Sequence, residues 1–159
     1  MKRCFLLVLV LATPLFLSQA LFGQDQEVAV KFSQQMWGSE LVLVGAIPGS
    51  DWKSVDVKNK DSELTPLRLQ SSKDGLGRLS WRLPNLSGGR LEINKAKSQT
   101  ALHGKLTIEN SGFLVVMTGS SSVSLRDLKT HLALSPGYYA VTATSQMGIT
   151  SNWVTFQIK

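Results

Sequence analysis

Apolar and polar residues alternate one by one through much of the chain, in short runs separated by turn-forming residues. In the run from Arg78 to Leu83, the apolar side chains of Leu79, Trp81 and Leu83 fall on one face and polar side chains on the other. This alternation is typical of a half-buried strand in an antiparallel sheet. No segment of about ten residues has a convincing helical period. Equivalent alternating runs surround Val55, Leu67, Leu91, Leu106 and Val123.

Turn-forming residues divide these runs at intervals of roughly 8 to 12 residues. Glycine and asparagine allow a positive φ and proline fixes φ, which is what tight turns require. Short strands with turns this regular predict an all-β sandwich or barrel of about ten to twelve strands. The turns are expected at Pro48-Gly49-Ser50-Asp51, Asn59-Lys60-Asp61, Lys73-Asp74-Gly75, Ser87-Gly88-Gly89, Asn110-Ser111-Gly112 and Ser135-Pro136-Gly137.

The last two runs predict a hairpin whose register follows from keeping both apolar faces in the core. The expected partners are Tyr139 with Ile158, Val141 with Phe156, and Ala143 with Val154. Residues 145–152 form the loop in this arrangement, and Trp153 lies on the outer face.

The segment Leu134-Ser135-Pro136-Gly137-Tyr138-Tyr139 resembles the tyrosine corner of immunoglobulin-like and fibronectin type III-like domains. The stretches Leu43 to Gly49 and Asp74 to Gly77 are similar to bacterial immunoglobulin-like modules of extracellular proteins. The resemblance implies an antiparallel immunoglobulin-like β-sandwich in which Tyr139 is structural and its hydroxyl reaches back to the preceding corner. It says almost nothing about function.

The N-terminus has the pattern of a secretory signal peptide. Lys2 and Arg3 precede an apolar run from Phe5 to Leu17, and Ser18-Gln19-Ala20 offers small residues for cleavage. We expect residues 1–20 to be removed, with cleavage after Gly23 as the alternative. The mature protein would be secreted, periplasmic or extracellular. It would have no disulfide, because Cys4 is the only cysteine, and no transmembrane segment.

Composition supports a folded mature domain, because 43% of the residues are hydrophobic and only 18% are charged. We expect a single domain over residues 24–159. The alternative is two small β units, 27–95 and 101–159, joined by a short polar linker at Lys95 to Gln99. The single domain is favoured because each half alone would bury a marginal core.

Catalytic patterns are sparse. His103 is expected in a turn and His131 on the exposed face of a strand, and no cysteine or second imidazole lies near either at a metal-ligand spacing. Ser50-Asp51-Trp52-Lys53 matches an S-x-x-K spacing, but its partner motifs are missing. We therefore predict a protein that is not an enzyme and needs neither cofactor nor metal. A small hydrolase is the least favoured alternative.

Two groups of residues are candidate ligand contacts. Four arginines fall on the polar side of alternating runs and would form a positive stripe if their strands were neighbours. Three tryptophans outside the clearest core positions are candidates for exposed sugar-stacking rings. These residues are Arg68, Arg78, Arg82 and Arg90, and Trp37, Trp52 and Trp153.

The sequence therefore predicts a non-catalytic module for protein–protein interaction or surface assembly, through strand edges and loops. The alternative function is binding of a neutral or anionic polysaccharide of the cell envelope. Nucleic acid is not expected as a partner, because aromatic residues do not alternate with the arginines.

Overall fold

A computed structural model describes residues 30–57, 65–70, 76–82, 89–146 and 148–159. Within these residues the chain forms ten strands and one short helix, in two antiparallel sheets. The elements are β1 (Phe32–Trp37), β2 (Glu40–Ile47), β3 (Trp52–Asp56), β4 (Thr65–Gln70), β5 (Arg78–Arg82), β6 (Gly89–Ala96), β7 (Lys105–Met117), β8 (Ser122–Ser124), α1 (Leu125–His131), β9 (Gly137–Thr144) and β10 (Val154–Ile158). The all-β prediction is confirmed, whereas an immunoglobulin-like topology is not.

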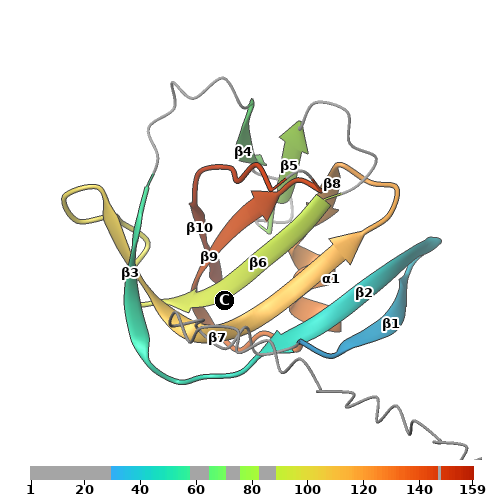
Figure 1. The fold of residues 1–159 in the computed structure, drawn as a ribbon, viewed down its shortest axis with the longest axis horizontal. Helices are drawn as coiled ribbons and strands as arrows, with labels where there is room; N and C mark the ends of the chain where they lie inside the picture. Colours follow the sequence, from blue (N-terminus) through green and yellow to red (C-terminus); the bar gives the residue numbers. More distant parts are fainter. Residues whose placement is uncertain (1–29, 58–64, 71–75, 83–88, 147) are drawn as a thin grey trace, which may run out of the picture.

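The larger sheet has the order β1-β2-β7-β6-β9-β10, and its long strand β7 also pairs with β3 (Figure 1). One edge of β7 pairs with β2 along its C-terminal half and with β3 along its N-terminal half. Strands from both halves of the sequence therefore share one sheet. The boundary considered between residues 95 and 101 does not separate two sheets.

The smaller sheet, β4-β5-β8, and helix α1 supply side chains that pack with the inner face of the larger sheet in the main core. Alternation explains this arrangement, because Leu79 and Trp81 on β5 and Leu91 and Ile93 on β6 are all buried. A second, smaller cluster includes Ala96 and Ile108 and lies outside that core.

The expectation of strands around Val123 to Arg126 and around His131 is only partly correct. β8 ends at Ser124, where the serine hydroxyl accepts a hydrogen bond from the backbone N–H of Asp127 at 3.0 Å and begins α1. A helix of seven residues is too short to display two full turns of a helical period. The alternation of Leu132 and Leu134 with polar or small residues therefore resembles the pattern of a strand.

Helix α1 ends in a left-handed turn. Leu132 is its C-cap, Ala133 has φ 49°, and the N–H of Leu134 donates to the carbonyl of Lys129 at 3.1 Å. This is the six-to-one bond of a Schellman motif, where glycine is the usual residue at the left-handed position. The turn buries the side chains of both Leu132 and Leu134.

The register predicted for the C-terminal hairpin is wrong by two residues. The observed partners are Val154 with Val141, Phe156 with Tyr139, and Ile158 with Gly137. A shift of two keeps every side chain on its face, so hydrophobic alternation cannot detect it. Backbone bonds from Ser145 N to Ile149 O and from Ser151 N to Ala143 O extend the hairpin into the expected loop.

Candidate functional site

The structure buries Trp37, so its ring is not an exposed sugar platform. It is 7% exposed, it stacks on His131 with 4.9 Å between ring centroids, and its Nε1 donates to Gln35 Oε1 at 2.9 Å. His131 is exposed, as expected, but it lies at the end of α1 and not on a strand. The close approach of α1 and β1 could not be inferred from local alternation.

The other two candidate tryptophans lie in different surroundings. Trp52 on β3 is 42% exposed, and Nζ of Lys97 lies 4.9 Å from the centroid of its ring. Trp153 is half-buried against the second cluster. The three tryptophans therefore do not form one aromatic surface.

The four arginines do not form one stripe. Arg68 and Arg78 are exposed on neighbouring strands of the smaller sheet, where Arg78 Nε donates to Ser122 Oγ at 2.9 Å. Arg82 pairs with Thr65 in the same sheet, and its side chain lies outside the described part. Arg90 belongs to the larger sheet, opposite Val116 and Thr144.

Tyr139 is buried at 6% exposure. Its hydroxyl donates to the carbonyl oxygen of Ser135 at 2.8 Å, and its ring stacks on Phe156 with 5.7 Å between centroids. The tyrosine therefore ties the start of β9 to the segment that leaves α1.

The outer edge of the larger sheet is formed by β1, which pairs with β2 and with no other described strand (Figure 1). Phe32 and Met36 on this strand are 43% and 58% exposed. Met36 stands opposite Leu41, which is 40% exposed, so apolar side chains extend from the edge onto β2. This edge carries no charged residue between Phe32 and Trp37.

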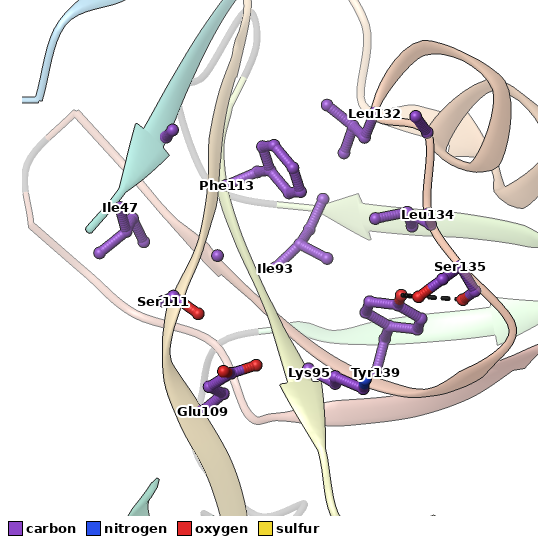
Figure 2. A pocket seen from close by; sticks show the side chains of 13 residues that line it. Ile47, Ile93, Lys95, Glu109, Ser111, Phe113, Leu132, Leu134, Ser135 and Tyr139 are labelled. Atoms are coloured by element: carbon purple, nitrogen blue, oxygen red, sulfur yellow. Dashed lines mark hydrogen bonds between the residues drawn. The ribbon is translucent and has the colours of Figure 1, made fainter. Parts of the chain in front are cut away.

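A cleft of about 290 Å³ opens where the inner face of the larger sheet meets the segment after α1 (Figure 2). Its apolar end is lined by Ile93, Phe113, Leu132 and Leu134. Its polar end is lined by Lys95, Glu109 and Ser111, from β6 and β7. These two strands position the polar groups, because Lys95 and Glu109 follow the same inward alternation as Ile93 and Phe113.

The backbone under the polar end is held by Asn94, which is fully buried. Its Nδ2 donates to the carbonyl oxygens of Glu109 and Ser111 at 3.0 and 3.2 Å. The pairing of β6 with β7 shifts here, and a Cβ on Gly112 would clash with the carbonyl oxygen of Ile93. Only glycine permits this approach.

The polar residues of this cleft belong to segments for which the sequence predicts other structures. Asn110-Ser111-Gly112 was expected to be a turn, but it lies inside β7. Lys95 was assigned to a possible linker, but β6 continues to Ala96. The alternation continues at Phe113 beyond Gly112, and this continuation is the sequence signal that indicates a single strand.

The described residues also bear on metal binding and membrane insertion. They include no group of three or more His, Cys, Asp or Glu side chains arranged to hold a metal ion. None of the helices in this part of the chain is long and apolar enough to span a membrane. His103 lies, as predicted, in a tight turn, with Gly104 as the second residue of positive φ.

Comparisons with known proteins identify no relative. No protein-family model, no curated protein and no solved structure matches this chain.

Proposed function

We propose that this protein is an exported, non-catalytic module that binds a partner protein through the edge of β1 that no described strand covers. The observation that carries the proposal is the exposed strand Phe32–Trp37, which ends the larger sheet and bears Phe32 and Met36 on its surface. The partner is an extended segment that adds to β1 as a further strand. Main-chain hydrogen bonds would supply affinity, and the apolar side chains would supply specificity.

Two other edge strands, β3 and β4, carry the protection that β1 lacks, whereas the uncharged edge strand β10 has its large apolar side chains buried. Natural sheets protect their edges with charged residues or proline. Strand β3 carries Lys53 and Asp56, and β4 carries Pro66 and Arg68. β1 has six residues and contains neither protection.

The test begins with selection of short peptides on the purified protein from a random library. Selected peptides are expected to alternate apolar and polar residues and to protect backbone amides of β1 from hydrogen exchange. Met36→Lys places a charge beside the edge and is expected to weaken peptide binding about tenfold or more. Leu102→Lys is the matched control, because Leu102 is also apolar and is 73% exposed, in the β6–β7 hairpin.

Equal losses in the two variants would overturn the proposal, as would protection confined to strands other than β1. A dimer that dissociates on Met36→Lys would also overturn it, because the edge would then be occupied by a second copy of the chain.

The proposal includes two finer points carried from the sequence. The signal-like N-terminus supports export, which is tested by sequencing the N-terminus of the protein recovered outside the cytoplasm. The bond from Tyr139 to Ser135 supports an immunoglobulin-like variant of the sandwich, although such a bond is local.

Polysaccharide binding is the second candidate function, and the exposed ring of Trp52 favours it. The test is titration of tryptophan fluorescence with neutral and acidic polysaccharides at low and high salt. A saturable shift that survives salt and disappears in Trp52→Ala would support sugar stacking. An unchanged spectrum would eliminate this function for Trp52.

A further inference from the structure

We propose that the cleft between the larger sheet and the segment after α1 binds a small zwitterionic ligand with an apolar side chain, of the class of the free apolar α-amino acids. The cleft does not include β1, so this inference is independent of partner binding at the edge.

The apolar end of the cleft is suited to a hydrocarbon or aromatic side chain. Leu132 and Leu134 form one wall, and Ile93 and Phe113 on adjacent strands form the other (Figure 2). The left-handed backbone at Ala133 lets both leucines face the sheet. A ligand side chain placed here would cover mainly the half-buried ring of Phe113, because Ile93, Leu132 and Leu134 are already buried in the core.

The polar end presents one positive and one negative side chain. Lys95 and Glu109 extend from neighbouring strands at the same end of the cleft (Figure 2). Neither belongs to an ion pair with another described residue. Lys95 can receive a carboxylate and Glu109 an ammonium group, while the hydroxyl of Ser111 offers a further hydrogen bond.

The dimensions and rigidity of the site favour a small ligand. Its volume of about 290 Å³ is close to the lower limit of about 300 Å³ for typical ligand pockets. Asn94 fixes the carbonyls of Glu109 and Ser111, so the backbone that carries these side chains is preorganised.

The experiment is calorimetric titration of the purified protein with L-phenylalanine and L-leucine. Two analogues each lack one charge: phenylalaninamide lacks the carboxylate, and N-acetylphenylalanine lacks the ammonium group. We expect saturable binding of both amino acids, and binding about tenfold or more weaker for each analogue, because each loses a charge-assisted hydrogen bond.

Variants then match each charge to its partner. Lys95→Met is expected to weaken phenylalanine binding about tenfold and to leave the affinity for phenylalaninamide unchanged. Glu109→Gln is expected to weaken phenylalanine binding about tenfold and to leave the affinity for N-acetylphenylalanine unchanged. Lys53→Met and Glu92→Gln are the matched controls. Lys53 Nζ and Glu92 Oε1 lie 3.8 Å apart on strands of the same sheet, and neither residue lines the cleft.

Absence of saturable binding at about 1 mM, which is weak for a specific site, would overturn the inference. Equal losses in the Lys53→Met and Lys95→Met variants would also overturn it, as would analogues that bind as well as the amino acids. Circular dichroism of each variant establishes that it is folded.

Discussion

The strands β1 and β10, which end the main strand order of the larger sheet, have similar composition but different surroundings. Neither β1 nor β10 contains a charge or a proline. On β10, Phe156 and Ile158 are each 1% exposed, and β4 lies beside the strand. On β1, Trp37 is buried against the core, but Phe32 and Met36 on the opposite face of the strand are exposed. An uncharged edge can therefore be either a covered structural strand or an open one, and only its neighbours distinguish the two.

Side-chain hydrogen bonds add to the cover over β10. Thr155 Oγ1 donates to the carbonyl oxygen of Gln99 at 2.7 Å. Nζ of Lys129, on α1, donates to the carbonyl oxygen of Lys159 at 2.8 Å. These contacts come from a hairpin loop and from the helix, and both are distant from β10 in sequence. The covered edge is thus a product of the tertiary fold.

The largest difference is expected from removing one phenylalanine at each edge. Phe156→Ala leaves a cavity beside Tyr139 and should lower the free energy of unfolding by about 3 to 5 kcal/mol. Phe32→Ala should lower it by less than about 1 kcal/mol, because its ring is already 43% exposed. Denaturant unfolding of both variants measures the difference, and equal losses would contradict the comparison.

A smaller effect is expected where Tyr139 supports the β10 side of the sheet. Tyr139→Phe keeps the ring on Phe156 but leaves the carbonyl of Ser135 without this donor, at a cost of about 1 kcal/mol. Ser135→Ala is the control, because it retains that carbonyl and removes only the hydroxyl contact at 3.2 Å. A Tyr139→Phe variant as stable as the parent in denaturant unfolding would show that the bond contributes nothing to stability.

The loss of one surface hydrogen bond should be local. Thr155→Val removes the bond to Gln99 and should lower stability by about 0.5 kcal/mol, since the bond is exposed to water. Native-state hydrogen exchange should accelerate at β10 and remain unchanged at β1. Faster exchange at β1 would mean that the two edges open together.

The smallest change in stability is expected at the open edge itself. Met36→Lys replaces a side chain that is 58% exposed, so the free energy of unfolding should change by about 0.5 kcal/mol or less. The same variant should leave light scattering unchanged, because the proposed partner of β1 is a different protein and not a second copy of the chain. Thermal unfolding and light scattering measure the two effects, and a large loss of stability would show that Met36 is structural.

Local structure follows from the sequence where one hydrophobic period extends along a whole segment. The alternation of Leu79 and Trp81 correctly identified a strand and its buried face. Prediction failed at Ser111 and Gly112, because a bulged strand and a turn use the same small residues. It also failed at α1, where one helical segment contains too few residues to establish a period.

The candidate cleft was beyond sequence reasoning for a different reason. Lys95 and Glu109 are separated along the chain, and nothing in their local sequences indicates that β6 and β7 place them at one end of a cavity. The wall formed by Leu132 and Leu134 further depends on the left-handed turn at Ala133. Such a site requires three segments to meet.

The sequence by itself determined that the described chain is built of antiparallel strands and which face of most strands is buried, because the side-chain period of two is a local property of an extended backbone. Tertiary structure decided the register of β9 with β10, the cover over one sheet edge and the charges gathered at the cleft. Each of these depends on hydrogen bonds and packing between distant segments, and a shift of two residues leaves the local pattern of hydrophobicity unchanged.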